Sequence, residues 1–548
     1  MTTGAGAIAD ALRDAGVDAV FGLPGVHNLA LWPACAQAGI HVVGSRHEQG
    51  CAYAADGYSR ATGRPGVALT TTGPGAANTL GAVGEAWASH SSVVVIASDI
   101  ATTLRRPGAY RGVLHECTDQ AGLFAPVTKA RVEVGRADEL GPAVRDALAR
   151  ALRAPRGPVY LGVPTDLLSA PVADASFGEL APHAAVPERA VAADAVETVR
   201  QLIERSQRPL IWIGGGTREA GSEIDALART LGAPVIASFQ ARGVLPATHP
   251  RLVGAPPHEP AVTELIEAAD FVLVVGSDLD HMNTMGWKLP LPRARAAINV
   301  DEIDATKNYD MDVVIEADAA AALRVLAHGV TAREPWIDVA TVTRAARDAL
   351  RADTEMAPAL EFVDHTRAAL ADDSVVFADM CIPGYWLSGQ YPVEQARGLH
   401  YPMGWGTLGF AFPAAIGAAV AVGRERSVVA VVGDGGVLFA LGELATVAQE
   451  RLPLTTVIVD DGGYGMLRWG HEDDPHNGCD LTAVDFVDVA RGFGIAAERV
   501  DGLGDDYERA LEKAAASGEP RVIHVSARLV PPHTTSPRWP LNAPRPTA

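Results

Sequence analysis

The 548-residue sequence lacks the features that mark nucleic-acid binding or a disulfide-stabilised fold. It carries 45 lysine and arginine residues against 66 acidic residues, for a formal net charge of -21, and it has no run of basic residues. A polyanionic partner such as a nucleic acid is therefore not expected. The five cysteines are odd in number, widely spaced and form no Cys-x-x-Cys pair. This indicates neither a disulfide framework nor a zinc site and fits a reducing cytoplasm.

Long hydrophobic runs are also missing. The longest apolar stretch, residues 408–423, stops at Arg424 and is too short to span a membrane. Residues 1–16 contain acids and lack the basic start and apolar centre of a signal peptide. These absences predict a soluble cytoplasmic protein with no membrane partner.

The sequence is rich in glycine, with 55 residues, many of them at the ends of short apolar runs. Runs such as VALTTTGPG, PLIWIGGG and SVVAVVGDGG alternate with longer stretches rich in alanine and leucine. That alternation is typical of βα units, with parallel sheets covered by helices on both faces. We predict an α/β protein of three doubly wound parallel-sheet domains, in which ligands bind at the carboxyl ends of strands.

Two stretches break this rhythm with proline, alanine and scattered charge, residues 167–192 and about 330–357, and they indicate linkers, the second partly helical. The predicted divisions, each domain of ordinary size, are 1–170, 190–330, 355–530 and a proline-rich tail, 531–548. We expect the tail to be irregular, either wrapped over the surface or disordered.

A faint internal similarity links two parts of the chain. Residues 52–75 and 409–436 both run from a small-residue helix through a Gly-Arg turn and an apolar strand to Gly-x-Gly. A true repeat and chance in an alanine-rich chain are both open at this point.

Two aspartates follow the ends of successive predicted strands. Asp434 stands in Gly433-Asp434-Gly435-Gly436, and Asp461 stands in VIVDDGGYGM. Neighbouring parallel strands would bring the two carboxylates to the same sheet edge. Glycines at a helix start let backbone amides approach a phosphate, and a phosphate beside carboxylates requires a cation such as Mg²⁺ or Ca²⁺. The alternative is that each acid only caps a helix or turn.

This pattern resembles the cofactor motif of thiamine diphosphate enzymes such as acetolactate synthase, benzoylformate decarboxylase, pyruvate decarboxylase and benzaldehyde lyase. The resemblance implies that Asp434, Asp461 and the backbone carbonyl of Gly463 bind Mg²⁺, which anchors the diphosphate of the cofactor. Where the family usually has two asparagines, this chain has Asp460 and Asp461. The partner of Asp460 is not evident from the sequence.

The resemblance covers essentially the whole chain. RHEQGCAYAADGYSRATGRPG is similar to the family's pyrimidine-binding domain, in which the glutamate at the position of Glu48 hydrogen-bonds the aminopyrimidine and promotes loss of the C2 proton. In YPMGWGTLGF the family places a carbonyl acceptor at Gly406 and an apolar wedge between the cofactor rings at Leu408. Without the motifs, Glu48 would be read as a surface residue and Leu408 as an ordinary core residue.

The matched motifs imply cofactor contacts from Pro24, Gly25, Glu48, Gly73, Asn78, Gly406, Leu408, Gly433, Asp434, Gly435, Gly436, Asp461, Gly463, Tyr464, Gly465 and Met466. Because these residues lie on two domains, the resemblance implies a homodimer or homotetramer with active sites between chains.

The central part carries PLIWIGGG, in which a strand leads into glycines. Such a turn alone is a weak nucleotide signal. Acetolactate synthases bind FAD here and carry an arginine-rich segment where this chain has Asp278 and Asp280. Because an acid opposite a pyrophosphate is unfavourable, FAD is not expected.

Two histidines bear on the reaction. Pyruvate decarboxylases have a catalytic aspartate where this chain has Val26, in the segment FGLPGVHNLALWP. The segment is more similar to benzaldehyde lyase and the guanidino-oxopentanoate decarboxylases, which have a histidine at the position of His27. The guanidino-oxopentanoate decarboxylases also have the sequence LHE found here around His115. We predict that both histidines transfer protons, against the alternative of helix-cap or core histidines.

The resemblance thus implies thiamine diphosphate- and Mg²⁺-dependent non-oxidative decarboxylation of a 2-oxo acid, with carboligation to an aldehyde as a further outcome. The alternatives are an acetolactate synthase-like or benzaldehyde lyase-like carboligase, a flavin-dependent 2-oxo acid oxidase, and a cofactor-binding protein without catalysis. The sequence does not identify the 2-oxo acid.

Overall fold

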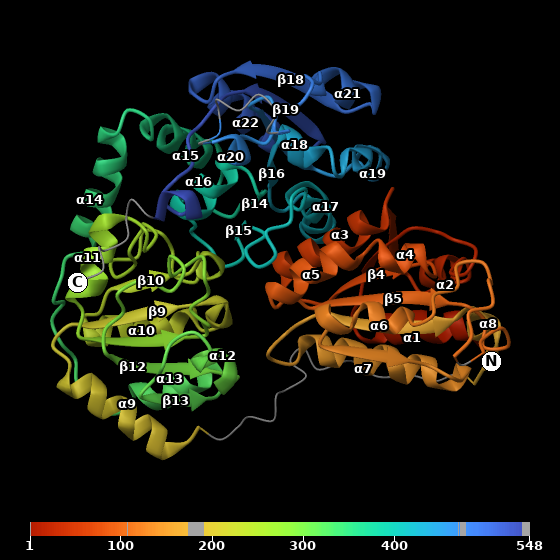
Figure 1. The fold of residues 1–548 in the computed structure, drawn as a ribbon, viewed down its shortest axis with the longest axis horizontal. Helices are drawn as coiled ribbons and strands as arrows, with labels where there is room; N and C mark the ends of the chain where they lie inside the picture. Colours follow the sequence, from red (N-terminus) through yellow and green to blue (C-terminus); the bar gives the residue numbers. More distant parts are fainter. Residues whose placement is uncertain (1, 107, 174–190, 470, 472–477, 540–548) are drawn as a thin grey trace.

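The computed structural model describes residues 2–106, 108–173, 191–469, 471 and 478–539. It contains three parallel sheets, one in each third of the chain (Figure 1). Among the described residues, no helix combines the length and the apolar character needed to cross a membrane.

The N-terminal sheet has six parallel strands in the order β3-β2-β4-β5-β7-β6. Its strands are β2 (Ala19–Gly22), β3 (His41–Gly44), β4 (Gly66–Thr70), β5 (Val93–Asp99), β6 (Ala130–Glu133) and β7 (Val159–Pro164). Its helices are α1 (Gly4–Asp14), α2 (Leu31–Gln37), α3 (Glu48–Thr62), α4 (Pro74–Ala77), α5 (Leu80–Ala88), α6 (Gln120–Leu123), α7 (Leu140–Leu152) and α8 (Thr165–Ser169).

The central sheet has five parallel strands in the order β10-β9-β11-β12-β13. They are β9 (Pro209–Ile213), β10 (Val235–Ala237), β11 (Phe271–Val275), β12 (Ala294–Asn299) and β13 (Val313–Glu316). The helices around them are α9 (Ala193–Arg205), α10 (Gly221–Leu231), α11 (Pro260–Ala268), α12 (Glu302–Thr306) and α13 (Ala319–Ala327).

The C-terminal sheet has six parallel strands in the order β15-β14-β16-β17-β19-β18. They are β14 (Val375–Ala378), β15 (Leu399–His400), β16 (Val428–Gly433), β17 (Leu454–Asp460), β18 (Ala496–Asp501) and β19 (Arg521–Ser526). The helices are α15 (Ala357–Ala369), α16 (Ile382–Gln390), α17 (Ala411–Val422), α18 (Asp434–Val437), α19 (Leu444–Glu450), α20 (Gly465–Arg468), α21 (Phe486–Gly492) and α22 (Asp505–Ala516).

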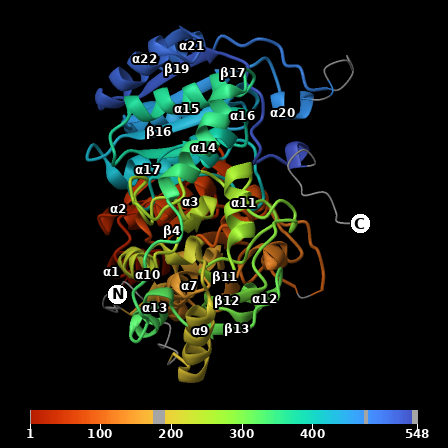
Figure 2. The same ribbon diagram turned by 90° about the vertical axis from the view of Figure 1, so that its left-hand side faces the viewer.

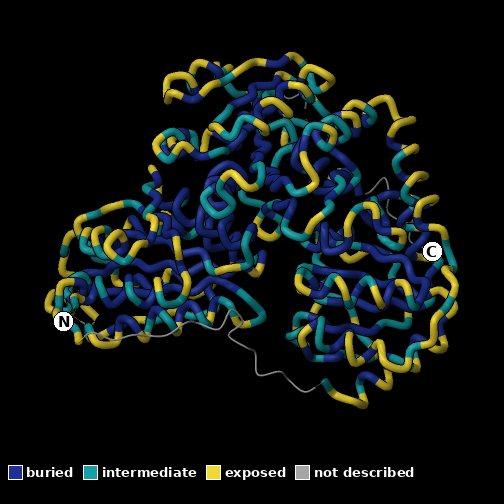
Figure 3. Tube along the Cα trace, turned by 180° about the vertical axis from the view of Figure 1, so that it is seen from behind, coloured by how far each residue is buried: buried dark blue, intermediate teal, exposed yellow. Residues whose placement is uncertain are grey.

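The predicted fold class is confirmed, and its cause is visible in the strands. Inner strands such as β5, β9 and β16 are buried along their whole length, because helices cover both faces of each sheet. Figure 3 shows this burial as dark tube through the sheets, with exposed turns and helix faces outside.

The two outer sheets have the same strand order relative to the sequence. The similar segments 52–75 and 409–436 hold equivalent places in them, since each contains the helix before the third strand, α3 and α17. These two helices pack against each other, as Figures 1 and 2 both show. A Cβ atom on Gly57 would overlap the carbonyl of Ala414, and one on Gly417 would overlap the carbonyl of Ala54. The two backbones are therefore in direct contact.

The segments between the domains have more structure than their composition indicates. At the start of the first predicted linker, α8 is followed by β8 (Pro171–Val172), which pairs with β1 (Thr2–Thr3), whereas residues 174–190 lie outside the described part. In the second, α14 (Val339–Ala352) packs apolar side chains into the core of the central domain. The tail packs there as well, through Trp539, and residues 540–548 lie outside the described part.

Candidate active site

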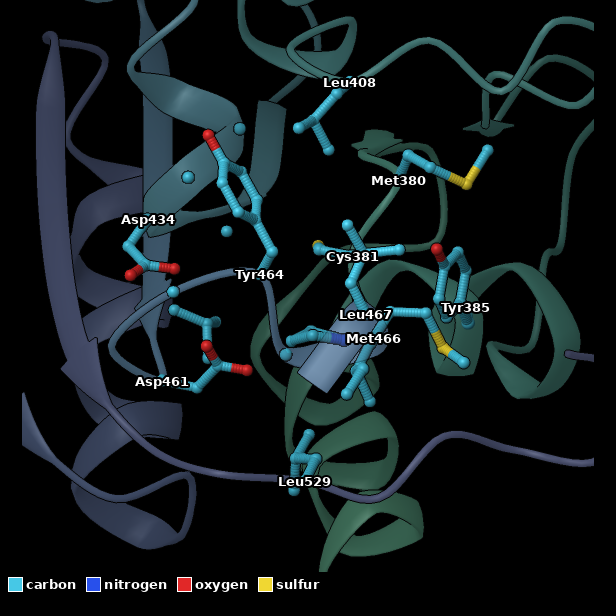
Figure 4. A pocket seen from close by; sticks show the side chains of 18 of the residues that line it. Met380, Cys381, Tyr385, Leu408, Asp434, Asp461, Tyr464, Met466, Leu467 and Leu529 are labelled. Carbon is cyan, nitrogen blue, oxygen red and sulfur yellow. The ribbon is translucent and has the colours of Figure 1, made fainter. Parts of the chain in front are cut away.

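The predicted acidic edge forms in the C-terminal sheet. β16 and β17 are neighbours, with Gly433 aligned to Val459, so Asp434 at the start of α18 and Asp461 after β17 emerge at the same edge. Both line one pocket. Figure 4 shows the two carboxylates on one side of it, with Met380, Tyr385 and Met466 on the other. The other predicted contacts in this pocket are Gly406, Leu408, Gly433, Gly435, Gly436, Gly463, Tyr464 and Gly465.

The electrostatics of this edge are those of a site short of positive charge. Burial and the neighbouring charge of Asp461 raise the pKa of Asp434 to about 7. Burial also raises the pKa of Asp461, against the opposing charges of Arg468 and Arg528. Oδ1 of Asp461 lies 3.3 Å from Nη2 of Arg468, but no described residue is its partner in hydrogen-bond geometry. Because a bound cation would reverse both pKa shifts, the residues present fit a divalent cation.

The backbone around the two acids leaves no room for side chains. A Cβ atom on Gly465 would overlap the Asp461 carboxylate, one on Gly435 would clash with the ring of Tyr464, and one on Gly463 would overlap the carbonyl of Cys479. Among the described residues, no group of three His, Cys, Asp or Glu side chains could hold a metal. A two-carboxylate set suits Mg²⁺, which keeps its other positions for phosphate, carbonyl and water oxygens.

Asp460 has a structural partner. Its Oδ2 lies 2.9 Å from Nε2 of His524, and its Oδ1 accepts a hydrogen bond of 3.0 Å from the amide of Gly462. His524 is buried on β19, the strand beside β17. Asp460 does not line the pocket, so its carboxylate is bound behind the edge at which Asp434 and Asp461 lie.

A buried aspartate that the sequence analysis missed supports the Gly406 segment. Asp379 follows β14, and its carboxylate accepts bonds of 3.2 Å from the amides of Gly409 and Phe410, at the start of α17. Burial raises its pKa to about 7. The sequence pattern that could have identified Asp379 is the one that identified Asp434, an acid directly after an apolar strand. It ties the segment bearing Gly406 and Leu408 to the end of β14.

Glu48 is buried at the start of α3, with 7% of its surface exposed, so it is not the surface residue that its local sequence alone would indicate. Its Oε2 accepts a hydrogen bond of 2.9 Å from Nδ2 of Asn78. The amide of Gly73 donates to Oε1 of Gln120, at 2.6 Å. Gln120, which the sequence analysis also missed, further donates to the carbonyl of Ser98. Glu48 and Asn78 are thus brought together.

The structure does not bring the two groups of predicted cofactor contacts together within one chain. The pocket at Asp434 and Asp461 is lined only by residues from 380 onward. Absent from its lining are the N-terminal contacts Pro24, Gly25, Glu48, Gly73 and Asn78.

His27 and His115 do meet. Their ring centroids lie 5.3 Å apart, with the ring planes inclined at 50°. Both Nδ1 atoms are buried without a hydrogen-bond partner among the described residues. One ring nitrogen of His258, His400 and His524 is in the same state, so the feature that distinguishes His27 and His115 is the contact between their rings. Burial and the charge of His115 lower the pKa of His27, and Asp99 opposes that shift. A neutral His27 can accept a proton and pass it on.

Asp278 and Asp280 both have partners within the central domain. Oδ2 of Asp278 lies 2.9 Å from Nζ of Lys307, and Asp280 accepts from the amides of Met282 and Asn283. Beside the glycine turn lies Arg218, whose pKa burial lowers to about 9. The electrostatic reason for expecting no FAD is therefore weaker than the sequence indicated, and the expectation stays a prediction.

Comparisons with known proteins agree with the three-domain arrangement. Three domain families of thiamine pyrophosphate enzymes match the chain: the N-terminal TPP binding domain over residues 2–123, the central domain over 196–326 and the C-terminal TPP binding domain over 381–525. The chain belongs to the thiamine pyrophosphate enzymes and uses thiamine diphosphate.

Particular relatives narrow the class. A "Probable 2-ketoarginine decarboxylase" of Pseudomonas aeruginosa is 32% identical over 94% of this chain and 92% of its own length. A "Probable acetolactate synthase large subunit" of Methanocaldococcus jannaschii is 27% identical over 95% and 91%. The solved thiamine diphosphate-dependent 4-hydroxybenzoylformate decarboxylase of Rhodococcus jostii shares the fold, with a TM-score of 0.79 at 24% identity over 96% of this chain and all of that one. The function is of the thiamine diphosphate-dependent decarboxylase or acetolactate synthase type.

Proposed function

We propose that this enzyme catalyses the Mg²⁺-dependent, non-oxidative decarboxylation of a 2-oxo acid. The observation that carries the proposal is the ring contact of His27 and His115, whose Nδ1 atoms have no hydrogen-bond partner in the described part of the chain. A decarboxylase must deliver a proton after carbon dioxide leaves, and a carboligase must instead admit an aldehyde. A paired imidazole site supports the first outcome.

The remaining residues bind and orient the cofactor. Asp434 and Asp461, with the carbonyl of Gly463, would hold Mg²⁺ and through it the diphosphate. When bound, thiamine diphosphate supplies the electron sink for cleavage of the carbon–carbon bond. Glu48, held by Asn78, would share a proton with the aminopyrimidine, while Leu408 would fix the angle between the two rings.

We further propose that two chains complete each active site, in a homodimer or homotetramer. The support is that Glu48 and the Asp434 pocket lie apart in one chain. Exposed apolar side chains occur beside both groups, Val26 and Leu29 near His27, and Phe439 and Leu467 near the acidic edge. Exposed apolar patches of this kind mark interaction sites.

Subunit mixing tests that arrangement. Glu48→Gln and Asp434→Asn should each abolish activity alone, and co-expressed chains should regain roughly a quarter of the wild-type activity, because half of the random dimers hold one intact site. Mixtures as inactive as the single variants would place both residues in one chain's site and contradict the proposal.

The substrate side chain is the least determined part of the proposal, because one chain supplies only part of the lining. Away from Asp434 and Asp461, the pocket is lined by groups such as Met380, Tyr385 and Met466. Because the probable 2-ketoarginine decarboxylase is a relative, the guanidino 2-oxo acid belongs in any substrate panel. An apolar 2-oxo acid belongs there as well, and because a second chain would complete the site, the panel decides between the two substrates.

A product panel tests the reaction. The holoenzyme is incubated with pyruvate, benzoylformate, 4-methyl-2-oxopentanoate and 5-guanidino-2-oxopentanoate, with and without an acceptor aldehyde, and separately with benzoin. The products are identified by mass spectrometry. Free aldehyde is the expected product. Acyloin alone would favour the acetolactate synthase-like alternative, benzoin cleavage the benzaldehyde lyase-like one, and bound flavin with oxygen consumption the oxidase. Activity that survives removal of Mg²⁺ and thiamine diphosphate would exclude all of them.

A further inference from the structure

The backbone just before Glu48 is held by the C-terminal domain of the same chain. The amides of Arg46 and His47 donate hydrogen bonds of 2.9 and 3.0 Å to Oε1 of Glu443. Glu443 ends the 3₁₀ turn η5 (Leu441–Glu443) and is 2% exposed. A buried carboxylate from one domain thus binds the two backbone amides that directly precede a helix in another.

The geometry around this carboxylate is closely packed. Its Oε2 accepts a bond of 2.6 Å from Oγ1 of Thr446. A Cβ atom on Gly50 would overlap Oε1, so the first turn of α3 approaches Glu443 without an intervening side chain. Burial raises the pKa of Glu443, and the hydrogen bonds from Thr446 and the two amides oppose that rise. Because a carboxylate at a helix N-terminus also complements the helix dipole, these contacts fix both the position and the direction of α3.

Weaker contacts surround the central one. Nη2 of Arg46 donates to Oε1 of Gln449 at 2.8 Å, and Nε2 of His41 lies 2.9 Å from Oε2 of Glu450. Both bonds are exposed and contribute little to stability in water. They supply matched controls, because they cross the same boundary without touching the backbone of α3.

We propose that Glu443 is a positioning residue for Glu48, holding from the neighbouring domain the backbone that presents Glu48 to the cofactor. This inference rests on the proposed function of Glu48. Glu443 follows Asp434 on one continuous segment, residues 434–443. In a dimer with sites between chains, the segment that binds Mg²⁺ in one active site would therefore hold the glutamate of the other.

Glu443→Asp, Glu443→Gln and the control Gln449→Ala test the proposal as Mg²⁺ holoenzymes. The readout is the rate of hydrogen–deuterium exchange at C2 of the bound cofactor, measured by quenched-flow NMR beside cofactor affinity. Withdrawing the carboxylate by one methylene in Glu443→Asp should slow C2 exchange by about 10- to 100-fold, the cost of a small misplacement of a reacting group. Glu443→Gln keeps an acceptor oxygen in place and should retain more of the rate. Gln449→Ala should match the wild type.

C2 exchange within twofold of the wild type in Glu443→Asp would overturn the proposal. Faster exchange in Glu443→Asp than in Glu443→Gln would also overturn it, since the effect would then follow charge and not position. A second readout needs no chemistry: backbone amide exchange in the peptide containing Arg46 and His47 should accelerate in Glu443→Asp, while that at the C-terminal end of α3 should not. Unchanged amide exchange in the peptide containing Arg46 and His47 would overturn the inference. A wild type without C2 exchange would refute only the proposed function of Glu48, and the amide measurement would still test the inference about Glu443.

Discussion

The N-terminal and C-terminal domains have the same strand order but different residues at the ends of corresponding strands. In each, the third strand of the sequence ends at the same place in the sheet, β4 before Thr71 and Thr72 and β16 before Asp434. The N-terminal loop continues through neutral hydroxyls to Gly73, whereas the C-terminal loop starts with an acid. The topology places the strand ends, and residue identity decides what they bind.

The next strands sharpen the contrast. Asp99 ends β5 and pairs with Arg105, so the protein itself supplies the counter-charge. Asp461, in the equivalent place after β17, keeps an oxygen without a hydrogen-bond partner among the described residues and lies beside a second acid, Asp434. Asp461 has Arg468 at 3.3 Å, whereas Asp434 is buried and forms no ion pair among the described residues. Asp434 therefore marks the position where a cation is expected from outside.

The largest expected effect is at Asp434, the buried acid without an ion pair among the described residues. Asp434→Asn should weaken thiamine diphosphate binding in the presence of Mg²⁺ by at least about 100-fold, the upper range for loss of a metal-site group. Isothermal titration calorimetry measures this. The same change should raise the melting temperature of the metal-free protein, because it removes repulsion with Asp461. Unchanged cofactor affinity would show that Asp434 is a helix cap, as in the simpler alternative.

The histidine pair is expected to give the next largest effect. His115→Phe and His27→Phe should each lower aldehyde formation by about 10- to 100-fold, at the lower end of what a general acid or base contributes. Cofactor affinity should not change, and with an acceptor aldehyde the share of acyloin should rise. Equal loss of both products would contradict a role in choosing between proton and aldehyde.

The metal-free stability should depend on pH in a defined direction. The pKa values of Asp434 and Asp379 are about 7 in the folded protein, against 3.8 for an ordinary aspartate. Between these values the folded state holds more protons than the unfolded state, so stability should fall as pH rises from about 4 to 7 and then level off. Asp434→Asn should remove only part of the slope, since Asp379 remains. Melting curves in a chelator test this, and a slope of the opposite sign would contradict the pKa shifts.

The smallest effect is expected at Asp460. Asp460→Asn keeps an oxygen for the amide of Gly462 and alters only the contact with His524, so cofactor affinity should change by less than about threefold. Titration beside Asp434→Asn compares the two acids directly. A loss as large as that of Asp434→Asn would make Asp460 a metal ligand.

The sequence was enough to predict those features of the site that depend only on where the strands end. Asp434 and Asp461 could be paired because parallel neighbours share an edge, and Gly433 and Val459 do align. The partner of Asp460 could not be predicted, because His524 becomes its neighbour only through the sheet order that inserts β19 beside β17. The contact of Glu443 with the backbone before Glu48 was hidden for a similar reason: it crosses a domain boundary and uses main-chain amides, which carry no residue signature.

The packing of α3 on α17 limits how these domains can be exchanged. With Gly57 and Gly417 facing the opposite backbone, no layer of side chains can repack when one helix changes. A chimera that takes only one outer domain from a relative would need both helices to keep the same path to within a few tenths of an ångström, about the slack that close-packed interiors allow. Chimeras that carry α3 and α17 over together should assemble more readily, so the pair of helices, and not either domain, is the exchangeable module.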